Sequence, residues 1–136
     1  NGVKLRIIGD HSAFEPEAVA LIDDALSRTA HNTGTVLTVA LNYGAQQEIA
    51  RAAAAAAQCG DVTVDSISAH LDTADLPPLD LLIRTSGEIR LSNFLLWQAA
   101  YAELYFTEVL WPDFTPEHFQ EAVASFAGRE RRYGGR

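Results

Sequence analysis

Short apolar runs alternate with longer amphipathic stretches along the chain. The runs are short, apolar and mostly bounded by turn residues, so we expect strands at Val3–Ile8, Thr35–Leu41 and Asp80–Ile83. The amphipathic stretches predict helices from Pro16 to near Gly34, over Ala45–Gln58, within Asp61–Asp75, over Asn93–Ala102, and from Pro116 to about Arg132. This alternation predicts an α/β fold in which helices flank a parallel sheet.

The same periodicity predicts which helical residues are buried. We expect inward-facing residues at Val19, Ile22 and Leu26, at Val64, Ile67 and Leu71, and at Phe119, Val123 and Phe126. The segment Val109–Phe114 is expected to be an apolar loop or edge strand.

The segment Asp80–Phe106 combines several features of an anion site. Arg84 ends a predicted strand, at the edge where open α/β sheets bind ligands. Gly87 allows a sharp turn, so that Arg90 can converge with Arg84 on one small volume. Ser92 is a suitable N-cap for the helix predicted after it. Two guanidiniums, a hydroxyl and a helix N-terminus together favour a phosphate or diphosphate site.

A simpler interpretation remains open for the two arginines. They can pair with Glu88, with Asp80 or with other surface acids, as solvated arginines commonly do. Glu103 is a carboxylate among apolar residues, and it therefore requires a cation or a proton. A metal ion or an arginine would serve, and a neighbouring diphosphate would favour Mg²⁺.

Composition narrows the functional classes. The net charge of -8 and the isoelectric point near 4.8 argue against a nucleic-acid-binding protein. A single cysteine, Cys59, excludes an internal disulfide and favours a reducing compartment. With no leader and no apolar run of bilayer length, we expect a cytoplasmic protein with at most peripheral membrane contact. The four histidines show no metal-ligand spacing that would predict zinc.

Polar residues also follow the first two predicted strands. Asp10 and His11 could act as an acid and a base, although turn formation explains Asp10 more simply. Asn42 and Tyr43 could line a site, although a turn-forming asparagine and a core tyrosine are the favoured interpretation.

Several motifs resemble those of the cis-prenyltransferases, the family that includes undecaprenyl diphosphate synthase. The most specific is RTSGEIRLSNFLLWQAAYAELYFTEVLWPDF, which begins at Arg84. The resemblance extends to VKLRIIGD at Val3–Asp10, LNYG at Leu41–Gly44 and RERRYGG at Arg129–Gly135. Ala45 and Ser86 stand where the family often has glycine.

The resemblance implies an enzyme that condenses isopentenyl diphosphate onto an allylic diphosphate to give a polyprenyl diphosphate. It implies that Arg84, Arg90 and Ser92 hold the diphosphate of isopentenyl diphosphate and that Glu103 is a Mg²⁺ ligand. Arg132 and Gly134 match a tail motif that reaches toward the partner's substrate in a homodimer.

The family's Asp-Gly-Asn-Gly-Arg motif, which carries the catalytic aspartate, has no match in the chain. We therefore expect residues 1–136 to be the C-terminal part of a single catalytic domain, with the N-terminal half absent, the sheet incomplete and no turnover by this chain alone. Two alternatives are a non-catalytic partner subunit and a simple diphosphate-binding module.

Overall fold

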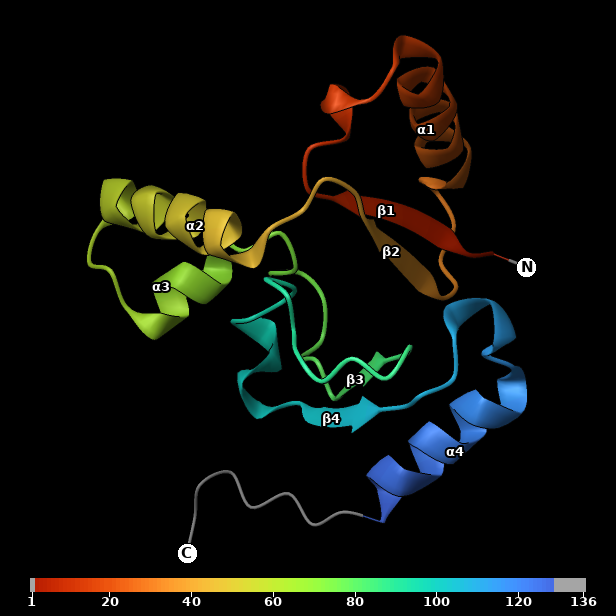
Figure 1. Ribbon diagram of the computed structural model, residues 1–136. Coiled ribbons are helices and arrows are strands. Elements are labelled where there is room, and N and C mark those ends of the chain that lie inside the picture. The colour runs from red at the N-terminus through yellow and green to blue at the C-terminus, as the bar shows by residue number, and fades with distance from the viewer. Residues whose placement is uncertain (1, 129–136) are drawn as a thin grey trace, which may run out of the picture. The chain divides into compact units, whose positions relative to one another are not determined.

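The computed structural model describes residues 2–128 and confirms the α/β class. The described residues divide into two compact units, 2–74 and 75–128, whose elements Figure 1 labels. Each unit contains one two-stranded parallel sheet and its own helices. Within residues 2–128, no helix is both long and apolar enough to cross a bilayer.

The first unit begins with a strand–helix–strand motif. Strand β1 (Lys4–Ile8) pairs in parallel with β2 (Val36–Ala40), and helix α1 (Pro16–Thr29) connects them. The register runs from Lys4 beside Val36 to Ile8 beside Ala40. Helix α1 packs on β1. It ends at Thr29, earlier than predicted, and the Thr29 hydroxyl accepts a hydrogen bond from the backbone N–H of Leu5 at 3.1 Å.

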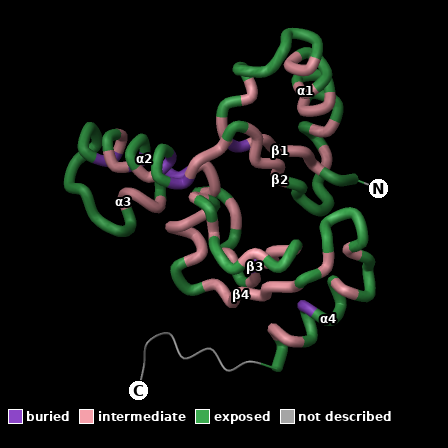
Figure 2. The backbone as a smooth tube through the Cα atoms, in the orientation of Figure 1, coloured by how far each residue is buried: buried purple, intermediate pink, exposed green. Residues whose placement is uncertain are grey.

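Two packed helices, α2 (Ala45–Cys59) and α3 (Val64–Ala69), complete the first unit. The buried residues of α2 are Ala45, Glu48, Ala52 and Ala56 (Figure 2). Their spacing places them on one stripe of the helix, where the small alanines allow neighbouring segments to approach closely. Helix α3 is shorter than predicted. Leu71 is buried as expected, but Val64 lies exposed in the first turn of the helix, so its predicted burial is wrong.

The second unit is built on β3 (Leu81–Arg84) and β4 (Glu103–Phe106), which pair in parallel. Helix α4 (Pro116–Ala127) packs on β3. Thr115 and His118 form a capping box at its start.

Two predictions in this unit are wrong. Residues 93–102 do not form an α-helix, because Ser92, Asn93 and Leu95 adopt positive φ angles that right-handed helices exclude. A short 3₁₀ helix at Gln98–Tyr101 leads instead into β4, a strand that the sequence pattern did not predict.

The buried face of α4 also differs from the prediction, and the helix ends at Ala127 rather than near Arg132. Phe119 and Val123 are exposed, whereas Ala122 is buried completely. The helix therefore buries the small side chain of Ala122 more completely than the predicted stripe, in which only Phe126 is half-buried.

Candidate functional site

The loop of residues 84–92, called the arginine loop below, follows β3 directly. Ser86 and Gly87 both have positive φ angles, +73° and +70°, which turn the chain sharply. Their backbone N–H groups donate hydrogen bonds to the carbonyls of Val109 and Thr107, each at 2.9 Å. The loop is thus anchored by its backbone to the segment after β4.

Arg84 is hydrogen-bonded to two other residues of the arginine loop. Its Nη1 donates to the backbone carbonyl of Arg90 and, at 3.0 Å, to the Ser92 hydroxyl. Arg84 thus contacts the backbone of Arg90 and the side chain of Ser92, whereas the convergence of the two guanidiniums on one ligand stays a prediction. Ser92, however, has a φ of +49° and starts no helix, so the helix N-terminus expected at this site is absent.

Arg90 is exposed and pairs with a neighbouring acid. Its Nη1 lies 2.5 Å from Oε2 of Glu88, and both side chains are accessible to water. The simpler interpretation offered for the arginines thus holds for this contact. An exposed ion pair contributes only about 0–1 kcal/mol, so a phosphate-bearing ligand could displace the Glu88 carboxylate.

Glu103 lies away from the arginine loop. It is the first residue of β4 and pairs with Leu81, whereas Arg84 pairs with Phe106 at the other end of the sheet. Three residues of strand separate the two positions by about 10 Å, and alternation places Glu103 and Arg84 on opposite faces. The structure therefore does not join Glu103 to the arginine cluster.

The sequence predicts Glu103 as a Mg²⁺ ligand. Across residues 2–128, no group of three or more His, Cys, Asp or Glu side chains could hold a metal ion. Mg²⁺ usually takes only one or two protein carboxylates together with substrate phosphates and water, so the role of Glu103 as a Mg²⁺ ligand stays a prediction. Arg132 and Gly134 lie outside the described residues.

The carboxyl ends of β1 and β2 carry turn chemistry rather than an acid–base pair. The Asp10 carboxylate accepts hydrogen bonds from the hydroxyl and the backbone N–H of Ser12, which hold its pKa below the ordinary value. Asn42, with a φ of +47°, donates through its side chain to the Asp10 carbonyl at 3.2 Å. His11 contacts Asp23 instead. The favoured turn interpretations of Asp10 and Asn42 are confirmed.

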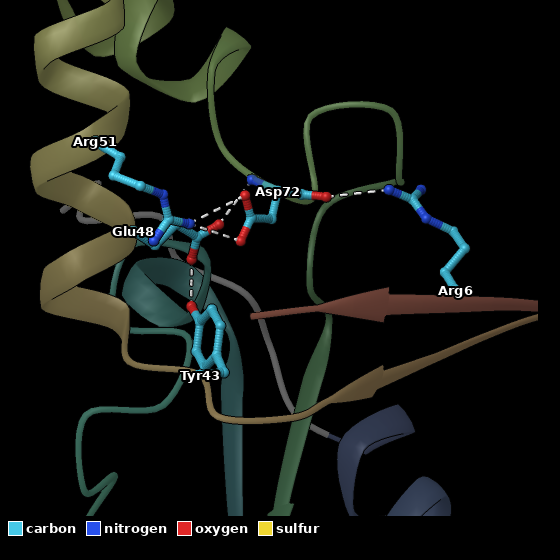
Figure 3. A network of polar contacts seen from close by, with 5 residues as sticks. All are labelled: Arg6, Tyr43, Glu48, Arg51 and Asp72. Atoms are coloured by element: carbon cyan, nitrogen blue, oxygen red, sulfur yellow. Dashed lines mark hydrogen bonds and ion pairs between the residues drawn. The ribbon is translucent and has the colours of Figure 1, made fainter. Parts of the chain in front are cut away.

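Sequence reasoning missed the most deeply buried charged residue among residues 2–128. Glu48 is 1% exposed and accepts hydrogen bonds from the Tyr43 hydroxyl and, at 2.8 Å, from the backbone N–H of Asp72. Arg51 donates to the Asp72 carboxylate at 3.0 Å, and Arg6 donates to the Asp72 carbonyl at 3.1 Å (Figure 3). These five residues, called the Glu48 network below, fasten the segment after α3 to α2 and β1.

A signal for Glu48 was present in the sequence. It lies three residues after Ala45 and four before Ala52, on the same helical stripe as the buried alanines. A carboxylate within a small-residue stripe must be hydrogen-bonded once the stripe is covered. Its partners at Asp72 could not be identified, because they are 24 residues away in sequence.

Comparison with known proteins agrees with the motif pattern. The prenyltransferase family model, described as that of undecaprenyl diphosphate synthase, matches residues 1–134. An isoprenyl transferase of Zymomonas mobilis is 51% identical over 98% of the chain. A ditrans,polycis-undecaprenyl-diphosphate synthase of Vibrio vulnificus, specific for (2E,6E)-farnesyl diphosphate, is also 51% identical over 98% of the chain. In both cases the chain spans 57% of the relative's length.

Solved structures give the same result for the fold. A probable undecaprenyl diphosphate synthase from Campylobacter jejuni matches with a TM-score of 0.85 and 38% identity, covering 98% of this chain and 64% of that one. A lavandulyl diphosphate synthase from Lavandula x intermedia, in complex with dimethylallyl diphosphate, matches with a TM-score of 0.86 and 35% identity, covering 97% and 60% respectively.

Proposed function

Because the chain belongs to the cis-prenyltransferase family, we propose that it is part of an enzyme that condenses isopentenyl diphosphate onto an allylic diphosphate. The product is a polyprenyl diphosphate of the undecaprenyl type. The observation that supports the proposal for this chain is the contact of Arg84, at the carboxyl end of β3, with the Arg90 carbonyl and the Ser92 hydroxyl.

The arginine loop holds the diphosphate of isopentenyl diphosphate in this proposal. Each guanidinium has five N–H donors, so Arg84 can keep its contacts to Ser92 and Arg90 while other N–H groups face a phosphate. On binding, Arg90 would leave the Glu88 carboxylate and contact the diphosphate, which carries a larger negative charge than the carboxylate. The chain as a whole repels anions, because its net charge is -8. The two arginines of this loop therefore carry a charge opposite to that of the chain as a whole.

The reaction itself requires little covalent chemistry from these residues. The allylic carbon–oxygen bond breaks and releases diphosphate, the double bond of isopentenyl diphosphate attacks that carbon, and loss of a proton leaves a cis double bond. The arginine loop would position the isopentenyl group and neutralise its diphosphate. We assign no catalytic residue within this chain, and we expect the chain alone to bind but not to turn over.

Magnesium, Glu103 and the tail complete the proposal for the whole enzyme. Glu103 would supply one carboxylate ligand to Mg²⁺, and the substrate diphosphate and water would supply the other oxygen ligands. The role proposed for Arg132 and Gly134 is to reach toward the substrate of a second protomer in a homodimer. No step of the chemistry above is assigned to these groups.

Calorimetric titration of the 136-residue chain with isopentenyl diphosphate tests the binding site. Arg90→Ala and Arg84→Ala should each weaken binding about tenfold to a hundredfold, because each removes charge-assisted hydrogen bonds. Arg28→Ala is the matched control, since Arg28 is also exposed and pairs with a nearby acid, Asp24, at 3.5 Å. It should leave binding unchanged.

Inorganic diphosphate distinguishes the alternatives. Equal affinity for inorganic and isopentenyl diphosphate would favour a simple diphosphate-binding module, and binding of neither would contradict the proposed site. Condensation of labelled isopentenyl diphosphate by the pure chain would overturn the expectation that it cannot turn over alone.

A further inference from the structure

A second pair of reactive side chains lies where the end of α2 approaches the residue after α3. Cys59 is the last residue of α2, and His70 immediately follows α3. The Cys59 Sγ lies 3.8 Å from the His70 Nε2, although the two residues are eleven positions apart in sequence. Both residues are exposed, so an ion in solution can reach the pair directly.

The tautomer of the neutral His70 ring follows from the contact of its other nitrogen. Nδ1 lies 2.7 Å from the backbone carbonyl of Ser66, which can only accept a hydrogen bond. Nδ1 therefore carries the proton of the neutral imidazole, and Nε2 presents its lone pair toward the Cys59 sulfur. A histidine whose second nitrogen donates to a backbone carbonyl is the usual arrangement around a bound metal ion.

The distance between the two atoms suits zinc. With Zn–S near 2.3 Å and Zn–N near 2.0–2.1 Å, a tetrahedral ion separates sulfur and nitrogen by ~3.6 Å, close to the observed 3.8 Å. The position also favours a cation, because Cys59 ends a 15-residue helix and the carbonyl end of a helix is negative.

We propose that Cys59 and His70 form a two-ligand site for Zn²⁺, separate from the arginine loop. Because residues 2–128 contain no cluster of three or more candidate ligands, water completes the coordination. On binding, the Cys59 thiol releases its proton to solvent and the thiolate ligates the ion. The bound ion links the end of α2 to the residue after α3. Spacing of the histidines alone did not predict this site, because one ligand is a cysteine brought close by the hairpin.

Alkylation of Cys59 by a maleimide tests the proposal, because the chain has a single cysteine. On tag-free, reduced protein, Zn²⁺ should slow alkylation in a saturable manner with one ion per chain. Co²⁺ should give a thiolate-to-cobalt absorption band that Cys59→Ser lacks. His70→Gln should weaken Zn²⁺ protection at least tenfold, whereas His31→Gln, which changes another exposed histidine of the same unit, should not. Melting temperatures without metal should be equal among the variants.

Two outcomes would contradict the proposed zinc site. Protection of equal strength in His70→Gln would mean that the thiol binds zinc without the histidine, and it would overturn the site. A stoichiometry of one ion per two chains, with a dimer in light scattering, would mean that two thiols from different chains share the ion, and it would equally overturn the proposal.

Discussion

The Glu48 network and the arginine loop are both polar clusters beside parallel strands, but they use their charges differently. In the network, Glu48 is buried and its partners come from separate elements, with contacts spanning up to 66 residues of sequence. In the arginine loop, Arg90 and Ser92 are exposed, and the side-chain contacts described there span eight residues or fewer.

This difference separates a structural cluster from one suited to a ligand. Contacts between distant segments form only in the folded unit, so the Glu48 network stabilises that unit directly. The arginine loop instead keeps cationic side chains at the surface on a backbone with several positive φ angles. Such a loop contributes little stability and leaves its guanidinium groups accessible to an anion.

We expect the largest loss of stability from a substitution in the turn after β1. Gly9 has a φ of +87°, and a Cβ there would lie 2.2 Å from the Leu41 carbonyl oxygen, so Gly9→Ala should lower the free energy of unfolding by about 3 kcal/mol or more. Gly87→Ala in the arginine loop is the control. Its φ is +70° but its nearest neighbour atom is 3.9 Å away, so only the conformational cost of about 1 kcal/mol applies. Equal losses in urea denaturation would contradict this contrast.

Glu48→Ala should cause the next largest loss of stability. It removes the acceptor of hydrogen bonds from Tyr43 and from the Asp72 backbone, and we expect a loss of about 2–3 kcal/mol in chemical denaturation. Glu121→Ala, at an exposed position of α4, should change stability by less than about 0.5 kcal/mol. A loss at Glu48 as small as that at Glu121 would mean that the network is not structural.

Ser86→Gly should raise stability, by about 0.5–1 kcal/mol, because glycine adopts the φ of +73° without the steric cost that serine carries. The same exchange within α1, Ser27→Gly, should lower stability by roughly 0.5 kcal/mol, since glycine disfavours a helix. Thermal melting of the two variants shows whether each exchange raises or lowers stability. A decrease for both would show that Ser86 is not strained.

The smallest effect concerns acid stability. The pKa of Asp10 is lowered in the folded chain by hydrogen bonds from Ser12, relative to an ordinary value of 3.8. Between these two values the unfolded state binds more protons, so the stability from Asp10 is present above about pH 4 and is lost as the pH falls through the lowered pKa. Melting temperatures from pH 5 to pH 3 should therefore fall slightly less for Asp10→Asn than for the original chain. A parallel fall would contradict a role for Asp10.

Local pattern determined much of the molecule. The β1, β2 and β3 strands, helix α2 and the Pro116 start of α4 lie within one or two residues of their predicted positions, because periodicity and turn residues act over short distances. The turn of the arginine loop was also predictable, since Gly87 adopts the positive φ that glycine favours.

Tertiary structure decided the remaining features, because each depends on pairing between distant segments. Residues 93–102 have helical periodicity, yet positive φ angles and the pairing of β4 with β3 override that preference. That pairing moves Glu103 from a predicted position near a helix to the start of a strand, away from Arg84. The burial of Glu48 and the meeting of Cys59 with His70 likewise arise only when separate elements pack together.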